Sequence, residues 1–341
     1  IDYLKRSIKI KRQLDRPIEI ANSLGNLALA YRRIGDYAKS ISLWEESIEL
    51  TKTNNIHVQL GRSIMNYANL LYYIGRTDQA HEKYLESLEL CKQFNNFADV
   101  GIIYRHLGLI ELNNDNPEQA IKYLLKANKT HQDTRHQIAI DTTTLFLAQA
   151  YLQNNDLDNA SKYVEQAVIL TNRRRHSDKT QSFDEYYTLP ARCVQALVNT
   201  KLDNSNKDDL DALLDEIINL HHEKHKGREL WWLAQAYHLL KDSKNAKKCQ
   251  QLAQDELYRK AERIRDKQIR KDYLELPPLH QQIFMNIADA ISKDSQSIKD
   301  DDMQNEHSGE SNIYKFCPSC GFNNENSFKF CPGCGSSLIS S

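Results

Sequence analysis

Four cysteines near the end of the chain have a spacing with a definite coordination chemistry. Cys317 and Cys320 form one Cys-x2-Cys pair, and Cys331 and Cys334 form a second after ten intervening residues. Each pair offers two thiolates from one CPxCG turn, and four tetrahedrally arranged thiolates are a ligand set of structural Zn²⁺. Residues 314–341 are too few to fold on apolar packing alone, so metal binding would supply the folding free energy. The spacing therefore predicts one structural Zn²⁺ per chain.

The same segment has other interpretations besides a structural zinc site. The tail resembles the short zinc ribbons of bacteria and archaea, which implies a small β domain. Rubredoxin-like iron would accept the same ligands, whereas a redox dithiol is typical of one Cys-x2-Cys pair on a βαβ unit. Four thiolates leave no open coordination position for catalysis. Ribbons also bind nucleic acid, but Lys315 and Lys329 beside an acidic linker make a poor contact surface for phosphates.

The composition of the whole chain excludes several classes of protein. Its 45 Lys and Arg balance 46 Asp and Glu, so no overall field attracts nucleic acid or an anionic membrane. No apolar run approaches the roughly 20 residues of a membrane span. The sequence shows no nucleotide-binding, hydrolase or kinase motif, which argues for a non-enzymatic protein without a small-molecule substrate. Cys91, Cys193 and Cys249 are expected as buried free thiols, which favours a reducing, cytoplasmic compartment.

Two further clusters of chemically capable side chains have plainer interpretations. His221 and His225 are one helical turn apart, as in a metal-binding pair, but no third ligand is evident nearby. An exposed polar helix end explains them better. Trp231 and Trp232 could form a ligand cage, yet core packing is favoured for at least one of them.

The elements that must position these residues repeat with a period of 40 residues. Six registers agree over four or five copies: three of small residues, two of large apolar residues and one of turn-forming residues. The small registers are Ser40, Ala80, Ala120 and Ala160; Ser7, Ser47, Ser87, Ala127 and Ala167; and Ala28, Ala68, Gly108 and Ala148. The large registers are Leu4, Trp44, Tyr84, Leu124 and Val164; and Leu27, Tyr67, Leu107 and Leu147. The turn register is Gly35, Gly75, Asp115 and Asn155.

This pattern predicts a pair of antiparallel helices in each repeat. Small residues let two helices approach closely, large residues fill the space beside them, and Gly, Asn or Asp forms the turn. One pair cannot bury its apolar face alone, so neighbouring pairs must stack. The segments LALAYRRIGDYAKSISLWEESIEL, YANLLYYIGRTDQAHEKYLESLEL and LGLIELNNDNPEQAIKYLLKA resemble the tetratricopeptide repeat family, in the longer form of kinesin light chains and bacterial signalling proteins. The resemblance covers roughly residues 1–262 and implies an all-α superhelical solenoid.

The repeats and the local composition divide the chain into six segments. Leu4 and Ser7 fall in second-helix registers, so we expect the chain to begin inside a repeat whose first helix is missing. The last long helix of the array is expected to continue until Pro277 and Pro278. The predicted segments are a second helix at 1–17, four repeats at 18–180, a degenerate and a further repeat at 181–275, a helix that caps the stack at 276–292, an acidic disordered linker at 293–313 and a zinc ribbon at 314–341.

The resemblance also implies a binding surface, because the first helices of such arrays line the concave face. One register of these helices holds Asn26, Asn66, His106 and Phe146, and its neighbours include Arg33, Arg62, Asn69, Tyr73 and Arg105. Asn amides can bond both the N–H and the C=O of an extended peptide, and arginines favour acidic side chains or a terminal carboxylate. Simple solvation of a polar groove explains the same residues equally well.

The predicted function is a non-enzymatic protein–protein interaction scaffold. It would bind a protein or peptide through the concave face and use the zinc ribbon as a second interaction module. The alternative is the C-terminal regulatory or sensory arm of a larger signalling enzyme, such as an ATPase, adenylate cyclase or kinase, because RKDYLELPPLHQQI resembles the close of repeat regions in such proteins. Residues upstream of Ile1 would distinguish the two.

Overall fold

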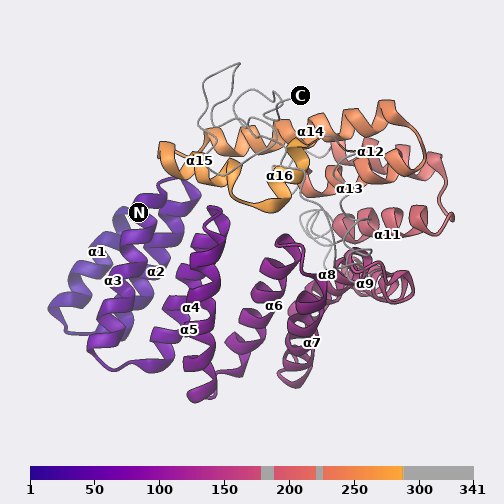
Figure 1. Ribbon diagram of the computed structural model, residues 1–341. Coiled ribbons are helices and arrows are strands. Elements are labelled where there is room, and N and C mark those ends of the chain that lie inside the picture. The colour runs from indigo at the N-terminus through magenta and orange to yellow at the C-terminus, as the bar shows by residue number, and fades with distance from the viewer. Residues whose placement is uncertain (178–187, 220–225, 286, 288–341) are drawn as a thin grey trace, which may run out of the picture.

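The first half of the molecule is a regular array of α-helices (Figure 1). The computed structural model describes residues 1–177, 188–219, 226–285 and 287. The helices of the array are α1 (Asp2–Gln13), α2 (Pro17–Arg33), α3 (Tyr37–Thr53), α4 (His57–Tyr73), α5 (Thr77–Gln93), α6 (Phe97–Asn113), α7 (Pro117–Asp133), α8 (Gln137–Gln153) and α9 (Leu157–Ser177). Each helix from α2 to α8 has 17 residues. The helix pairs predicted from the 40-residue registers are therefore confirmed in the array.

The turns between these helices explain the regularity. Three residues separate each helix from the next, and the middle residue always has a positive φ. After α2, for example, the N–H of Asp36 donates to the carbonyl oxygen of Tyr31 at 3.0 Å, which closes the helix around Gly35. The turns between repeats have the same form and carry Asp15, Asn55, Asn95 and Arg135. The backbone thus repeats every 20 residues, and the 40-residue period belongs to the side chains.

Small residues mark the places where two helices touch. The Ser40 hydroxyl donates to the carbonyl oxygen of Ala28 at 2.8 Å, so two of the small registers meet directly between α2 and α3. A Cβ atom on Gly108 would lie 2.7 Å from Cγ of Leu124, which is too close for a real side chain. The small and large registers therefore pack against each other as expected.

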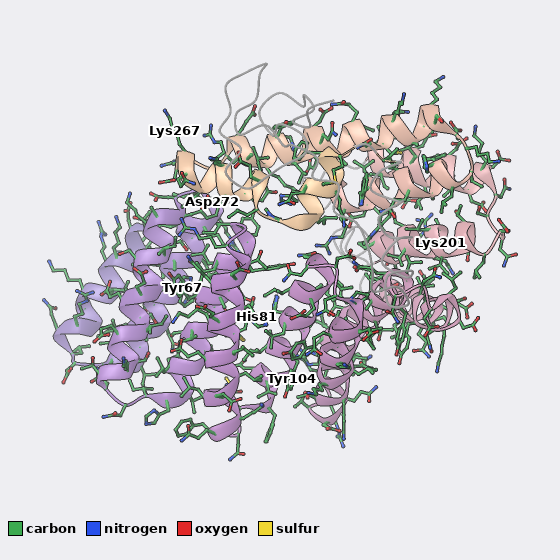
Figure 2. The ribbon with its side chains drawn as sticks, viewed as in Figure 1. Tyr67, His81, Tyr104, Lys201, Lys267 and Asp272 are labelled. Carbon is green, nitrogen blue, oxygen red and sulfur yellow. The ribbon has the colours of Figure 1, made fainter. Side chains whose placement is uncertain are left out.

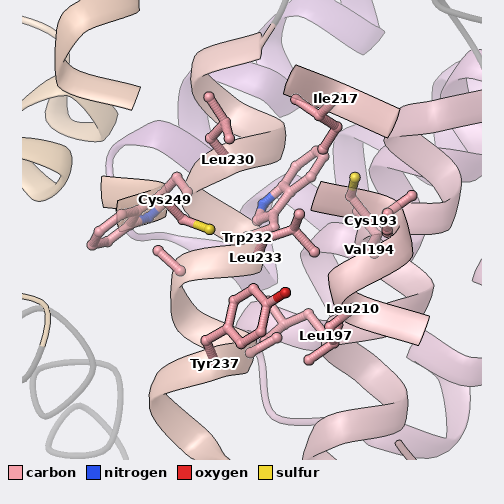
Figure 3. Packing of buried hydrophobic residues seen from close by; sticks show 14 of the residues in the cluster. Cys193, Val194, Leu197, Leu210, Ile217, Leu230, Trp232, Leu233, Tyr237 and Cys249 are labelled. Carbon is pink, nitrogen blue, oxygen red and sulfur yellow. The ribbon is translucent and has the colours of Figure 1, made fainter. Parts of the chain in front are cut away.

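Beyond α9 the helix pairs lose their uniform length. They are α11 (Leu189–Lys201), α12 (Lys207–Asn219), α13 (Lys226–Leu239), α14 (Ser243–Glu262), α15 (Lys267–Glu275) and α16 (Pro278–Phe284). Helix α11 packs mainly against α9 and α13 and makes few contacts with α12. Trp232, Leu233 and Tyr237 of α13 lie in the buried core with Cys193 of α11 and Cys249 of α14 (Figure 3). The two helices of the sixth pair, α13 and α14, pack closely, whereas α11 and α12 of the degenerate fifth unit scarcely contact each other.

The end of the array differs from the sequence-based expectation. A single helix was expected to run from the sixth pair to Pro277, but α14 ends at Glu262 and α15 begins at Lys267. Asp266 starts the new helix, because its Oδ1 accepts a hydrogen bond from the N–H of Ile269 at 2.9 Å. Within the predicted capping helix at 276–292, the structure describes α16, Met285 and Ile287.

Residues 263–285, which we call the C-terminal arm, return to the first repeats. In Figure 1, α15 lies over the ends of α2 and α4. Ile264, Ile269 and Tyr273 share a hydrophobic cluster with residues of the first repeats, among them Ile74. Nε of Arg76 contacts Oδ2 of Asp272 at 3.2 Å, and Figure 2 places Asp272 on α15 beside that end of the array. The arm thus joins two distant parts of the array, which a simple end cap would not do.

Candidate functional site

Three of the predicted peptide-binding residues lie close together on α4 and α6, around a tyrosine of α5. The hydroxyl of Tyr84 donates to Oδ1 of Asn69 at 2.6 Å, and Nδ2 of Asn69 donates to Oδ1 of Asn66 at 3.4 Å. The Tyr84 and His106 rings stack with their centroids 5.2 Å apart. This cluster fixes the orientation of Asn69 and His106. Nδ2 of Asn66 has no hydrogen-bond partner among the described residues.

His106 is a neutral side chain in this cluster. Burial lowers the pKa of His106 to about 3, and the positive charge of Arg105 adds to the shift. Its Nδ1 atom is buried without a hydrogen-bond partner among the described residues. At neutral pH the imidazole therefore has one N–H to donate and does not repel a cation.

Two of the predicted arginines hold neighbouring repeats together. Nε of Arg62 on α4 contacts Oδ2 of Asp99 on α6 at 3.1 Å, and Asp99 is almost fully buried. Nη1 of Arg105 on α6 donates to the hydroxyl of Thr142 on α8 at 3.1 Å. Both side chains link the first helix of one pair to the first helix of the next. Their guanidinium groups are therefore already committed in part to the fold.

The remaining predicted residues lie nearer the beginning of the array. Asn26 and Arg33 are exposed on α2. Tyr73, also exposed, is 6.4 Å from the ring of Tyr273 in the C-terminal arm, measured between ring centroids. The guanidinium of Arg32 lies over the Tyr73 ring, 5.5 Å from its centroid. Tyr73 thus belongs to the junction with the arm, apart from the cluster at Asn66, Asn69 and His106.

A cavity on the inner face was not foreseen from the sequence. Its volume is about 110 Å³, and α6, α8, α11, α13 and α16 supply its walls. The side chains that matter for its chemistry are Gln149, Lys201, Arg228, Trp231, Trp232 and Gln282. Trp231 and Trp232 are 2% and 8% exposed, so they pack in the core and also line the cavity. Two features of the sequence could have indicated this site. One is the tryptophan pair, and the other is that Gln149 is in the same register as Asn69, two repeats later.

The predicted metal ligands were compared with the described part of the chain. The part that the structure describes holds no group of three or more His, Cys, Asp or Glu side chains arranged for a metal ion. The four cysteines predicted to bind Zn²⁺ and the pair His221 and His225 fall outside the described residues. Cys91, Cys193 and Cys249 are buried free thiols, as expected. Burial raises the pKa of Cys249 to about 12, which keeps it protonated and unreactive.

Helices long and apolar enough to cross a membrane are absent from the described residues.

Comparisons with known proteins agree with this architecture. A tetratricopeptide repeat family model matches residues 19–93, and a second one matches residues 145–170 and 230–256. The response regulator aspartate phosphatase A of Bacillus subtilis is 21% identical over 168 residues, which are 49% of this chain and 43% of that protein. The chain thus spans less than half the length of this curated relative.

Two solved structures show the same kind of fold. The apo form of RapI has a TM-score of 0.61 and 15% identity, over 77% of this chain and 91% of that one. A signal transduction ATPase with numerous domains and a tetratricopeptide repeat sensor, from Pyrococcus horikoshii, has a TM-score of 0.52 and 17% identity, over 79% of this chain and 42% of that one. The chain therefore contains tetratricopeptide-type helical repeats stacked as a solenoid.

Proposed function

We propose that this protein is a non-enzymatic interaction scaffold whose inner face binds an extended peptide segment of a partner. Stacked repeats of this kind present an extended concave surface suited to such ligands. The observation that carries the proposal is a pair of amide groups with unused donors on first helices. Nδ2 of Asn66 and Nε2 of Gln149 have no hydrogen-bond partner among the described residues. Amides so placed suit the backbone of an extended peptide.

A selection from a random linear peptide library tests this function. Selected peptides are synthesised, and their dissociation constants are measured by fluorescence anisotropy on the full chain. Asn66→Ala combined with Gln149→Ala should weaken binding about tenfold, since two hydrogen bonds are lost. The control Lys129→Ala changes an exposed residue of α7 and should bind as the parent does. Failure to enrich any peptide, or equal affinity of the double variant, contradicts the proposal.

The zinc ribbon is proposed as a second, structural module. Cys317, Cys320, Cys331 and Cys334 would hold one Zn²⁺, whose binding energy folds the segment. Metal analysis of the purified protein should show that Cys320→Ser has lost its zinc. In the anisotropy assay, the same variant should bind peptides as the parent does. A reducing, cytoplasmic location suits both the thiolate ligands and the three buried free thiols.

A second candidate function is that of a regulatory or sensory arm in a larger signalling enzyme. The similarity to an ATPase that carries a repeat sensor favours it. Under this proposal the inner face still binds a peptide or protein, and the bound state is relayed to a catalytic domain. The two candidates therefore share one binding surface. They differ in whether binding there regulates a catalytic domain of the same protein.

A further inference from the structure

The cavity between α6, α8, α11, α13 and α16 is lined by two cations and, among the described residues, by no compensating acid. Arg228 of α13 and Lys201 of α11 both line it, and neither has an ion-pair or hydrogen-bond partner among the described residues. Acidic side chains are absent from the lining, as far as the described residues extend. Both cations are half-buried, so water solvates them less well than it would on an open surface. Such a site attracts an anion.

A buried amide in the same cavity lacks an acceptor. Nε2 of Gln149 is buried, and no hydrogen-bond acceptor for it exists in the described part of the chain. Buried polar groups are almost always hydrogen-bonded, so an unpartnered donor beside two cations favours a ligand oxygen. Gln282 of α16 adds a second amide to the lining.

The remaining walls are partly apolar, and the amides of Asn113, Gln153 and Gln235 also line them. The apolar part consists of Trp231 and Trp232 together with leucines of four helices, which are Leu109, Leu112, Leu152, Leu197 and Leu279. A ligand that places an oxyanion beside the two cations and an apolar group against the indole and leucine side chains would match this lining. A carboxylate attached to a hydrocarbon group has this character, whereas a phosphate ion lacks the apolar part.

The charge of Arg228 acts on one residue of the first repeats and on one residue of the C-terminal arm. Burial raises the pKa of Tyr72 on α4, and the charge of Arg228 opposes that shift. Burial also lowers the pKa of His280 on α16 to about 4, with Arg228 among the cations that add to the effect.

We propose that this cavity binds a carboxylate of the peptide partner, with Arg228 and Lys201 as its charge partners and Gln149 as a hydrogen-bond donor. The inference rests on the proposed function and adds the chemistry of the ligand. The carboxylate belongs either to the peptide's C-terminus or to an acidic side chain, and the apolar walls receive the adjoining hydrocarbon group.

Three small probes test the proposal on the full chain. They are N-acetyl-leucine, N-acetyl-glutamic acid α-amide and the uncharged N-acetyl-leucinamide. Binding is followed by calorimetry and by tryptophan fluorescence, since Trp231 and Trp232 are two of the three tryptophans. N-acetyl-leucine is expected to bind with a dissociation constant of about 1 mM, which is ordinary for a ligand of this size. The leucinamide should bind at least about tenfold more weakly.

Variants locate the site. Arg228→Gln and Lys201→Gln should each weaken carboxylate binding about tenfold, and Arg228→Lys should weaken it less because the charge remains. Lys129→Gln, on an exposed face of α7, is the matched control. Circular dichroism confirms that each variant is folded. No saturable binding by the parent, equal binding of the leucinamide, or an unchanged Arg228→Gln would overturn the proposal.

The probes also separate this inference from the proposed function. Tighter binding of N-acetyl-leucine indicates a terminal carboxylate, and tighter binding of the glutamic acid amide indicates a side chain. Library peptides that need Asn66 but tolerate Arg228→Gln and carry no required carboxylate would support the peptide function and reject the cavity site. Carboxylate probes that bind while no peptide is enriched would support the cavity and reject the peptide function.

Discussion

Helices α2–α8 and helices α11–α16 are built from the same helix pairs but are held together differently. In the first set every helix has 17 residues and packs mainly against its immediate neighbours. The second set ranges from 7 to 20 residues, and its helix α15 contacts the first repeats. The ion pair of Arg76 and Asp272 joins residues 196 positions apart. A periodic array is thus stabilised by local contacts, whereas the irregular part depends on contacts with distant residues.

The two regions meet at the turns after α2 and α4. The residues at positions 35, 75, 115 and 155 all have positive φ, and Asp115 and Asn155 show that glycine is not required by the backbone alone. A Cβ atom at Gly35 would lie 2.1 Å from the carbonyl oxygen of Arg263, and one at Gly75 would lie 2.7 Å from that of Asp272. Glycine therefore marks the two turns on which the C-terminal arm rests.

Gly35→Asn tests this interpretation and has the largest expected effect. Asn accepts a positive φ, so the main change is the clash with the carbonyl oxygen of Arg263. The variant should lose about 3 kcal/mol of unfolding free energy in urea titrations followed by circular dichroism. Amide hydrogen exchange in α15 should accelerate at the same time, because the clash displaces the C-terminal arm from the turn at residue 35.

Asn155→Gly is the matched control, since it changes the same turn position between α8 and α9. It removes a side chain where glycine also fits, and its effect should stay within about 0.5 kcal/mol. A Gly35→Asn variant as stable as the parent, with unchanged exchange in α15, would show that the arm is not seated on this turn.

Much of the regular region could be predicted from the sequence, because each packing position of the repeat needs the same type of residue in every copy. The small registers at Ser40 and Ala28 reported close helix contacts, and the structure confirms them. The arm and the cavity occur once, so no register indicated them. The glycines at 35 and 75 were assigned to turn geometry alone, although half of their role is to make room for Arg263 and Asp272. Arg228 stood in no repeating pattern. The other walls of its cavity come from four further helices, α6, α8, α11 and α16.

A second prediction compares one buried acid of the irregular region with one buried histidine of the array. Burial raises the pKa of Glu229 on α13 to about 7 and lowers that of His131 on α7 to about 4. The folded state thus keeps the Glu229 proton at a pH where the unfolded chain has lost it. The protonated Glu229 therefore contributes to the free energy of unfolding at low pH, and this contribution is lost as the pH rises towards 7. The His131 contribution has the opposite sign and is lost as the pH falls below about 6.5.

Glu229→Gln mimics the protonated acid and should remove its part of this dependence. Relative to the parent, the variant should gain about 2 kcal/mol of unfolding free energy between about pH 5.5 and pH 7.5. His131→Gln should have the opposite effect: relative to the parent, its free energy of unfolding should increase as the pH falls below about 6.5. Parallel stability curves for the parent and Glu229→Gln would mean that the acid is ionised in the folded protein throughout this range.

The smallest expected effect distinguishes the two regions most directly, because it compares two ion pairs of the same chemistry. Arg62 and Asp99 link neighbouring repeats, while Arg76 and Asp272 link the array to the arm. A double-mutant cycle to Ala should give a coupling energy of about 0.5–1 kcal/mol for each pair, since both arginines are partly exposed.

Repeating both cycles in the Gly35→Asn background separates local from distant support. The displaced arm can no longer hold Asp272 beside Arg76, so the coupling of that pair should fall to about zero. The coupling of Arg62 with Asp99 should persist, because their two helices remain neighbours in the array. If the Arg76–Asp272 coupling survives as well, α15 is anchored independently of the α14–α15 turn. The arm would then be held by the cluster around Tyr273 and Ile74, and Gly35 would matter for the turn alone.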